Sequence, residues 1–360
     1  MRRTSPIWVG GLFALLGGVV WTRASAQAIT VPEGFDVSVF ADGIAGVRAL
    51  AVGPDGMIYA TLSGSGRIVK IDPAGDGEAF SVVEGLNRPY GITFHDGWMY
   101  VGERHQIVRF RSPDHRMSEV VVPDLPTGGS HWTREIVFGS DGMLYVSVGS
   151  SCNLCEEADP RRAAVTRYRP DGSDAKIVAS GLRNAAGLAV HPATGAIWAS
   201  QNERDMLGDD VPFEEINVLD DGDHFGWPYC HGDREVNPEY RDRAEFCRGT
   251  TPPALSIQAH SAPLGMTFYS ADHFPAEYHG DLFVALHGSW NRSERVGYSL
   301  VRVRVENDRP VAYEDFATGW LSGGRVSGRP VYPVVGPDGS LFLSDDEGGR
   351  IYRIRWVGLE

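Results

Sequence analysis

The residues best suited to chemistry are one histidine and three arginines, each close to the start of a predicted strand. His131 lies in a glycine-rich loop before "REIVFGSDG" and could act as a general base near neutral pH, or be an ordinary surface-loop histidine. Arg183, followed by Asn184, lies just before the strand "GLAVHP", and Arg48 and Arg329 hold similar positions near the two ends of the chain. Three arginines that converge in an acidic protein favour an anionic ligand, unless each pairs with a neighbouring carboxylate.

Carboxylates are concentrated in the stretch "NERDMLGDDVPFEEIN", which begins at Asn202. They are Glu203, Asp205, Asp209, Asp210, Glu214 and Glu215. Hard oxygen ligands at this density suit Ca²⁺, and the glycine and proline nearby expose further backbone carbonyls. The order of residues does not match an EF-hand loop, and a solvated acidic loop is the alternative interpretation.

The stretch "GSWNR" at Gly288–Arg292 is typical of a binding loop, because an exposed Trp290 beside Arg292 can stack on a flat ligand. Motifs of several other enzyme classes are absent from the sequence. It contains no G-x-S-x-G nucleophile elbow, no H-E-x-x-H zinc motif, no P-loop and no G-x-G-x-x-G that opens a helix.

The N-terminus has the features of an export signal. Arg2 and Arg3 precede an apolar stretch, Ile7–Trp21, and Ala24-Ser25-Ala26 forms a small-residue cleavage site. A membrane-spanning helix needs about 20 apolar residues and would be marginal here. We therefore expect a signal peptide at 1–26, a periplasmic or secreted mature protein and no membrane span after cleavage, with an uncleaved anchor as the alternative.

Export would place the four cysteines in an oxidising compartment. Proximity favours the pairs Cys152–Cys155 and Cys230–Cys247, although three pairings are formally possible. Zinc is the competing interpretation, but the second pair lacks the spacing of zinc ligands. Residue 156 is glutamate, so the chain has no C-x-x-C-H motif for haem attachment.

The composition limits the classes of partner and fold. The chain has 33 basic and 47 acidic side chains, which give a formal charge of −14. Because of this negative charge, we expect neither a nucleic-acid partner nor binding to anionic membranes. Glycine accounts for 44 of the 360 residues. That share exceeds the usual value of about 7% and predicts many tight turns between short strands.

Six segments share one pattern, in which a strand, an Asp-Gly-type turn, a second strand, a polar loop and a third strand follow one another. The turn glycines are Gly56, Gly97, Gly142, Gly195, Gly280 and Gly339, at intervals of 41, 45, 53, 85 and 59 residues. Strand repeats of this length are typical of β-propellers. We therefore predict an all-β, six-bladed propeller in a single domain over 27–360, with an insertion at about 202–260 and the site at one mouth of the channel.

Several motifs resemble those of the soluble sugar dehydrogenases that use pyrroloquinoline quinone (PQQ). These motifs are "GSHWTREIVFGSDGMLYVSVG", "GLRNAAGLAVHPATG", "DDVPFEEINVL", "GDHFGWPYC", "HGSWNRS" and "GRPVYPVVGPDGSLFLSDD". The stretches "SSCNLCEE" and "HGSWNR" are similar to the sorbosone dehydrogenase branch of that family. The resemblance covers nearly the whole mature chain and implies a six-bladed propeller, which agrees with the repeats.

The resemblance also implies roles for individual residues. His131 matches the catalytic base that takes the proton from the anomeric hydroxyl of the sugar, and Arg183 matches the arginine near the quinone oxygen. The implied cofactor contacts are Arg48, Asn184, Trp290, Arg292 and Arg329. The segment of Glu203, Arg204 and Asp205 matches the loop that supplies calcium ligands.

Two positions depart from the aldose dehydrogenases of that family. Ser150 stands where an aspartate orients the histidine, so either Ser150 or Asp159 would have to take that role. Arg204 and Asp205 replace a Gly-Pro pair whose carbonyls bind calcium, so calcium would bind through different atoms.

The resemblance thus implies an exported quinoprotein that oxidises an aldose or a sugar aldehyde such as sorbosone. PQQ would accept a hydride, Ca²⁺ and Arg183 would stabilise the developing negative charge, and His131 would remove the hydroxyl proton. Electrons would pass to an external cytochrome or quinone, because the chain has no haem motif. A calcium-dependent propeller lactonase, which does not explain the three arginines, and a non-catalytic propeller binding module are the alternatives.

Overall fold

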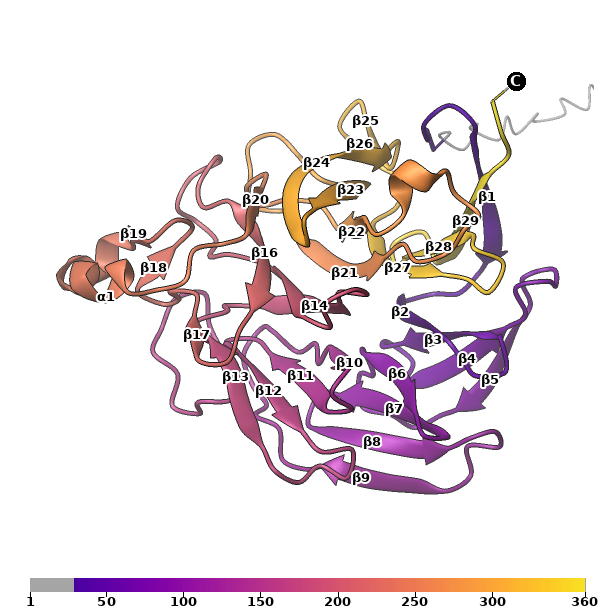
Figure 1. The fold of residues 1–360 in the computed structure, drawn as a ribbon, viewed down its shortest axis with the longest axis horizontal. Helices are drawn as coiled ribbons and strands as arrows, with labels where there is room; N and C mark the ends of the chain where they lie inside the picture. The colour runs from indigo at the N-terminus through magenta and orange to yellow at the C-terminus, as the bar shows by residue number, and fades with distance from the viewer. Residues whose placement is uncertain (1–28, 360) are drawn as a thin grey trace, which may run out of the picture.

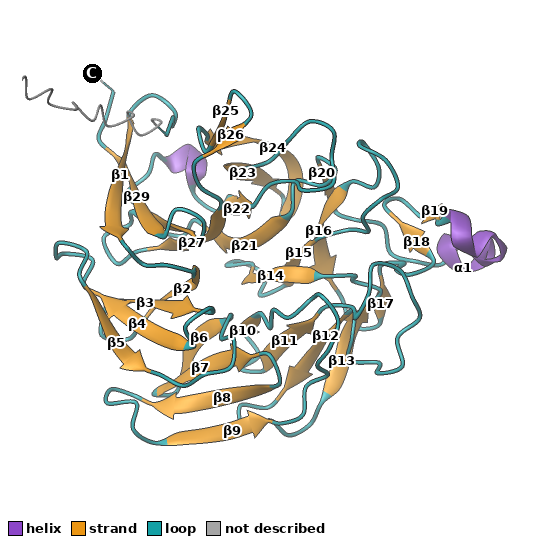
Figure 2. Ribbon diagram, turned by 180° about the vertical axis from the view of Figure 1, so that it is seen from behind, coloured by secondary structure: helices purple, strands orange, loops and turns teal. Residues whose placement is uncertain are grey.

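The computed structural model describes residues 29–359, and the predicted signal peptide at 1–26 lies outside them. Across this range, six sheets surround a central channel, five with four antiparallel strands and one with a fifth, parallel strand (Figure 1). The prediction of an all-β, six-bladed propeller is therefore confirmed. Helical segments lie at the periphery (Figure 2). They are the 3-10 helices η1 (Pro238–Arg243) and η2 (Ala276–Tyr278) and the short helix α1 (Ala244–Arg248).

The strands of each blade follow chain order from the channel outward, with one exception described below. The first blade contains β2 (Val47–Val52), β3 (Ile58–Leu62), β4 (Arg67–Ile71) and β5 (Ala79–Val83). The second contains β6 (Ile92–His95), β7 (Trp98–Glu103), β8 (Gln106–Arg111) and β9 (Ser118–Val122). The third contains β10 (Ile136–Phe138), β11 (Leu144–Val148), β12 (Ala164–Tyr168) and β13 (Lys176–Ser180), to which β17 (Asp223–His224) adds in parallel.

The remaining blades complete the ring. The fourth contains β14 (Ala185–Val190), β15 (Ile197–Gln201), β16 (Glu214–Leu219) and β20 (Leu255–Ile257). The fifth contains β21 (Pro263–Phe268), β22 (Leu282–Leu286), β23 (Ser299–Glu306) and β24 (Arg309–Ala317). The sixth contains β27 (Pro330–Val335), β28 (Leu341–Asp345), β29 (Arg350–Trp356) and, outermost, β1 (Phe35–Asp42). Two short hairpins lie outside the blades, β18 (Cys230–His231) with β19 (Glu235–Val236) and β25 (Leu321–Ser322) with β26 (Arg325–Val326).

The sixth blade closes the ring by joining the two ends of the chain. Strand β1 pairs antiparallel with β29, from Phe35 opposite Trp356 to Asp42 opposite Arg350. Figure 1 shows the indigo β1 directly beside the yellow β29. Hydrogen bonds between these distant segments hold the first and last blades in one ring.

The turn glycines explain why the repeats can be recognised in the sequence. All six have φ between 72° and 84°, the left-handed region that glycine adopts at little cost, and each lies between the first and second strands of its blade. The second strands are the most buried: β3, β11, β15, β22 and β28 are buried at every position. Neighbouring blades cover both of their faces, so their sequences are rich in apolar and aromatic residues.

The predicted insertion at 202–260 is too broad. Strands β16 and β20 fall within that range yet belong to the fourth blade. The sequence pattern is lost after β15 because the polar loop that leads to the third strand, β16, is long and covers residues 202–213. The additional segment is 220–254, and its α1, β18 and β19 project from the side of the ring (Figure 1).

Candidate active site

A cavity of about 500 Å³ lies where the innermost strands of several blades begin. Arg48 reaches it from β2, Arg183 from the residues ahead of β14 and Arg329 from the residue before β27. The structure therefore brings together three arginines that are far apart in the sequence. His131, Asn184, Trp290, Glu203 and Asp205 also line this cavity.

His131 is held by Ser150, one of the two residues predicted to orient it. Its Nδ1 lies 3.0 Å from both the carbonyl oxygen and the Oγ of Ser150. The Ser150 hydroxyl donates its proton to the carbonyl of Cys152 at 2.6 Å. Because both Ser150 oxygens then face Nδ1 as acceptors, Nδ1 carries the proton and Nε2 keeps its lone pair. Asp159 instead bonds to Arg161 at 2.8 and 3.0 Å.

His131 is neutral over the physiological pH range. Burial, reinforced by the positive charge of Arg183, lowers the pKa of its imidazole to about 3. Gly149 allows the close packing of this corner, since a Cβ there would lie 2.5 Å from Asn184 Oδ1 and 2.7 Å from His131 Cβ. His131 is thus a positioned, uncharged proton acceptor.

Arg183 is only 4% exposed and is fixed along the whole edge of its guanidinium. Its Nη1 donates to the carbonyls of Asn202 (3.2 Å) and Glu203 (2.7 Å). Its Nη2 donates to Asp205 Oδ2 at 2.8 Å and to Asn153 Oδ1 at 2.9 Å. We refer to Arg183, Asn153 and Asp205 as the inner clamp.

Arg204 points away from the cavity, although it directly precedes Asp205. Its guanidinium pairs with Glu239 at 2.7 and 3.0 Å and donates to Asn237 Oδ1 at 3.0 Å. We refer to Arg204, Asn237 and Glu239 as the outer clamp. Since Arg204 is a buried cation committed to a carboxylate outside the cavity, its side chain does not join the predicted calcium ligands.

The other two cavity arginines differ in their partners. Arg48 forms an ion pair with Asp346, whose other oxygen accepts a hydrogen bond from His287 Nε2 at 2.9 Å. Burial lowers the pKa of His287 to about 4, so this histidine is neutral at pH 7. Arg329 donates to the carbonyls of His287 (3.0 Å) and Gly288 (2.8 Å). Within residues 29–359, no carboxylate pairs with the guanidinium of Arg329.

Buried carboxylates lie on the same side of the cavity as Arg183, and two of them, Glu203 and Glu214, line it. Burial raises the pKa of Glu203 to about 7 and that of Glu214 to about 8, and it also raises the pKa of Glu215. Glu214 accepts hydrogen bonds from the backbone N–H of Glu203 (2.7 Å) and of Ala262 (3.3 Å). These contacts fix the backbone from which Glu203 and Asp205 reach the cavity.

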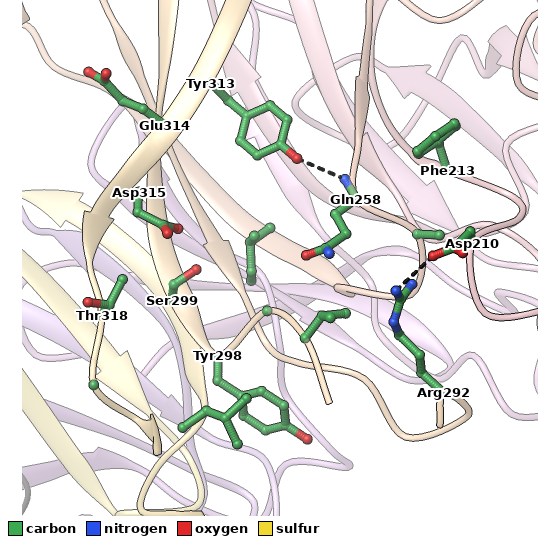
Figure 3. Close-up of a pocket in the computed structure, with 16 residues that line it drawn as sticks. Asp210, Phe213, Gln258, Arg292, Tyr298, Ser299, Tyr313, Glu314, Asp315 and Thr318 are labelled. Carbon is green, nitrogen blue, oxygen red and sulfur yellow. Dashed lines mark hydrogen bonds and ion pairs between the residues drawn. The ribbon is translucent and has the colours of Figure 1, made fainter. Parts of the chain in front are cut away.

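Arg292, a predicted cofactor contact, lies outside this cavity. It lines a second cavity of about 820 Å³ at the side of the fifth blade (Figure 3). There its Nη2 pairs with Asp210 Oδ1 at 2.7 Å, and its Nη1 donates to the carbonyl of Asp209. The neighbouring Trp290 does line the central cavity and is 72% exposed. Arg292 therefore binds the acidic loop instead of the central cavity, and the "GSWNR" pattern alone could not reveal this partner.

Both predicted disulfides are present, Cys152–Cys155 and Cys230–Cys247. Among residues 29–359, one group has the spacing of metal-ligating atoms, namely Cys152, Cys155 and Glu157. Because both sulfurs are in a disulfide, this group offers no thiolate to a metal.

Several cavity residues were not singled out from the sequence as site residues. Trp132, whose ring centre lies 5.4 Å from the Arg48 guanidinium carbon, directly follows His131. Asn153 lies inside the C-x-x-C pair, and His287 begins the "HGSWNR" stretch. Their positions inside sequence motifs could have identified them as candidates. Their partners could not be predicted in this way, because they come from other blades.

Comparison with known proteins places the chain in a family. Residues 29–357 match the sequence profile described as TrAA12-like. The chain belongs to the TrAA12-like family. Its relatives include the aldose sugar dehydrogenase YliI of Escherichia coli, which is 26% identical over 96% of this chain and 86% of the relative.

Solved structures show the same fold. A calcium structure of the Trichoderma reesei carbohydrate-active enzyme of family AA12 matches with a TM-score of 0.80 and 20% identity, covering 93% of this chain and 98% of that one. The holo form of the pyranose dehydrogenase PQQ domain of Coprinopsis cinerea matches with a TM-score of 0.77 and 22% identity, covering 91% and 97%. No helix within residues 29–359 is long and apolar enough to cross a membrane.

Proposed function

We propose that this TrAA12-like protein is a PQQ-dependent dehydrogenase that oxidises an aldose or a sugar aldehyde of the sorbosone type. The observation that supports the proposal most is Arg329, a cavity arginine whose guanidinium has no carboxylate partner within residues 29–359, in the same cavity as a neutral, oriented His131. Arg48 and Arg183 line that cavity too, although each already pairs with one carboxylate. The names of two relatives, an aldose sugar dehydrogenase and a pyranose dehydrogenase PQQ domain, agree with it.

The free polar groups of the cavity fit a flat anion with several carboxylates. The guanidinium of Arg329 has no carboxylate partner within residues 29–359, and Nε of Arg48 is buried without a hydrogen-bond acceptor. Trp132 beside Arg48 and the exposed Trp290 offer aromatic surface for a planar ring system. Arg48 and Arg329 would hold cofactor carboxylates, with Asn184 and Trp290 as further contacts.

The cavity also offers oxygen donors that suit calcium. Asn184 Oδ1 is buried without a hydrogen-bond donor, and the carboxylates of Asp205 and Glu203 line the same cavity. Ca²⁺ prefers such carboxylate and amide oxygens. We therefore keep Glu203 and Asp205 as proposed ligands, add Asn184 and omit the side chain of Arg204.

The residues of the chain would divide the work of the reaction. When bound, PQQ supplies an electrophilic carbonyl carbon that accepts a hydride from the sugar. His131 Nε2 would take the proton of the sugar hydroxyl, while Ser150 holds Nδ1–H and so keeps Nε2 as the acceptor. The fixed charge of Arg183 would stabilise the negative charge that develops in the cavity.

Electrons would leave through an external acceptor, a cytochrome or a quinone. The two disulfides support export to the periplasm or the medium, because such bonds persist in oxidising compartments.

The test is reconstitution of the purified protein with PQQ and Ca²⁺, followed by an assay of sugar-dependent dye reduction. We expect binding of the quinone to change its absorbance, and an aldose or sugar aldehyde to support dye reduction. His131→Ala should keep quinone binding and lose turnover by about 10²- to 10⁴-fold. An unchanged quinone spectrum with no dye reduction for any sugar would refute the proposal, and hydrolysis of a lactone without quinone would favour a hydrolase.

A further inference from the structure

Asn153 lies inside the small ring that the Cys152–Cys155 disulfide closes. Its side-chain Oδ1 accepts hydrogen bonds from Arg183 Nη2 (2.9 Å) and from the backbone N–H of Asp205 (2.8 Å). Its Nδ2 donates to the carbonyl of Asp205 at 3.0 Å. This single side chain therefore joins the arginine of the inner clamp to the backbone of its carboxylate.

The backbone of Asn153 adds a second set of contacts. Its carbonyl accepts from Arg183 Nε at 3.2 Å and from Trp227 Nε1 at 3.1 Å. Asn153 thus occupies two of the three nitrogens of Arg183, and the carbonyls of Asn202 and Glu203 occupy the third. A guanidinium fixed in this way is already in position before the reaction, so no rotational freedom has to be lost during it.

The same ring also reaches the histidine. The carbonyl of Cys152 accepts the proton of the Ser150 hydroxyl, and the two Ser150 oxygens face His131 Nδ1. Ser151, directly before the ring, is fixed by Glu157, whose carboxylate accepts hydrogen bonds from the serine N–H and, at 2.9 Å, from the serine hydroxyl. One covalently closed loop therefore supports the partners of both His131 and Arg183.

We propose that Asn153 is a positioning residue that aims Arg183 and Asp205 into the cavity, and that the Cys152–Cys155 disulfide keeps it in place. The contacts of Asn153 are observed in the structure, whereas the reaction that they would serve rests on the proposed function. The Cys230–Cys247 disulfide gives a matched comparison, since it cross-links the projecting segment 220–254, from which no residue lines the cavity, whereas the Cys152–Cys155 ring contains the cavity residue Asn153.

The first experiment replaces the asparagine of each clamp. In Asn153→Ala, we expect Arg183 to become reactive to phenylglyoxal, as mapped by mass spectrometry, while labelling of Arg204 stays at the wild-type level. In Asn237→Ala, labelling of Arg204 should rise while labelling of Arg183 stays at the wild-type level. This measurement needs neither cofactor nor turnover, so it tests the clamp even if the proposed function fails. Unchanged labelling of Arg183 in folded Asn153→Ala would overturn the inference.

The second measurement follows the cofactor and the reaction. Titration of PQQ by quenching of tryptophan fluorescence should show weaker binding in Asn153→Ala, and kcat should fall by about 10- to 100-fold. Asn237→Ala should match the wild type in both. If the wild type binds no PQQ, the proposed function fails; if the wild type binds and turns over and Asn153→Ala equals it, the positioning role fails.

The disulfide is tested with paired double variants. Cys152→Ser with Cys155→Ser should raise the labelling of Arg183 and lower kcat in the same direction as Asn153→Ala, whereas Cys230→Ser with Cys247→Ser should change the thermal midpoint but neither of those readouts. If the first pair does not fold, mild reduction of the wild-type protein, with labelling read before unfolding, replaces it. Equal labelling of Arg183 in the oxidised and reduced protein would exclude the ring from the positioning role.

Discussion

The inner and outer clamps use the same interactions for different ends. Each holds a buried arginine with one carboxylate and one asparagine oxygen. Each also lowers the pKa of a histidine, because Arg183 adds to the effect of burial on His131 and Arg204 adds to it on His231. The inner clamp faces the cavity, whereas the outer clamp ends at Glu239, whose side chain is 51% exposed. Position in the fold, and not bonding pattern, separates a candidate catalytic group from a structural one.

Replacing the two arginines should give the largest contrast. Arg183→Met should lower kcat/KM by about 10²- to 10³-fold, the usual effect of losing a fixed group that stabilises developing charge. Arg204→Met should leave kcat/KM of the folded protein unchanged. The measurement is dye reduction with the reconstituted protein. Equal losses in both variants would mean that the two clamps share one role.

Replacing the arginine of the outer clamp should instead lower stability. In Arg204→Met, the fully buried Asn237 keeps an oxygen without its donor, so the free energy of unfolding should fall by about 1–3 kcal/mol. Urea unfolding followed by tryptophan fluorescence measures this change. Absence of any loss would show that the outer clamp contributes nothing to the fold.

Histidine titration separates the two clamps electrostatically. Arg183→Met should raise the pKa of His131 above about 3, yet keep it below the ordinary value because burial persists, and should leave His231 unchanged. Arg204→Met should raise the pKa of His231 alone. NMR titration of the imidazole signals reads both. A shift of both histidines in either variant would contradict separate clamps.

The same titration predicts a pH dependence of stability. The folded protein keeps His131 neutral down to about pH 3, whereas the unfolded chain protonates it near pH 6.5. The unfolded state therefore binds more protons in this window, and His131 makes the protein less stable as the pH falls from about 6.5 to 3. Urea midpoints measured across this range should fall less steeply in Arg183→Met than in the wild type.

The smallest effect should come from the exposed end of the outer clamp. Glu239→Ala removes a carboxylate that is 51% exposed, so water can take its place beside Arg204 and the change should cost below about 1 kcal/mol of unfolding free energy. Dye reduction should be unaffected. A loss as large as that of Arg204→Met would assign the stabilising role to the ion pair rather than to Asn237.

The propeller could be predicted because its signals are local. Turn glycines such as Gly56 and Gly339 and the strands around them lie within a few residues of one another, so backbone conformation and alternation are visible in the sequence. Burial of the second strands also follows from composition. The bounds of the insertion were predicted too broadly because the long loop at 202–213 hides the third strand, β16.

The site was less predictable because its contacts join distant segments. Arg204 and Asp205 are adjacent in sequence, yet one bonds to Glu239 and the other faces Arg183. Arg292 looked like a cofactor contact until the acidic loop supplied Asp210 as its partner. The direction of each side chain depends on loops from other blades, which the sequence pattern around the residue does not specify.

Closure of the ring by β1 has a consequence for how the site comes into being. Arg48 follows β1 closely in the chain, and its partner Asp346 lies 298 residues further on, just before β29. Contacts of such separation form late in folding, after the intervening chain has collapsed. Synthesis of the first five blades therefore yields a polypeptide without a complete site. The capacity to hold an anionic ligand should arise in a single step, when the two ends of the chain meet.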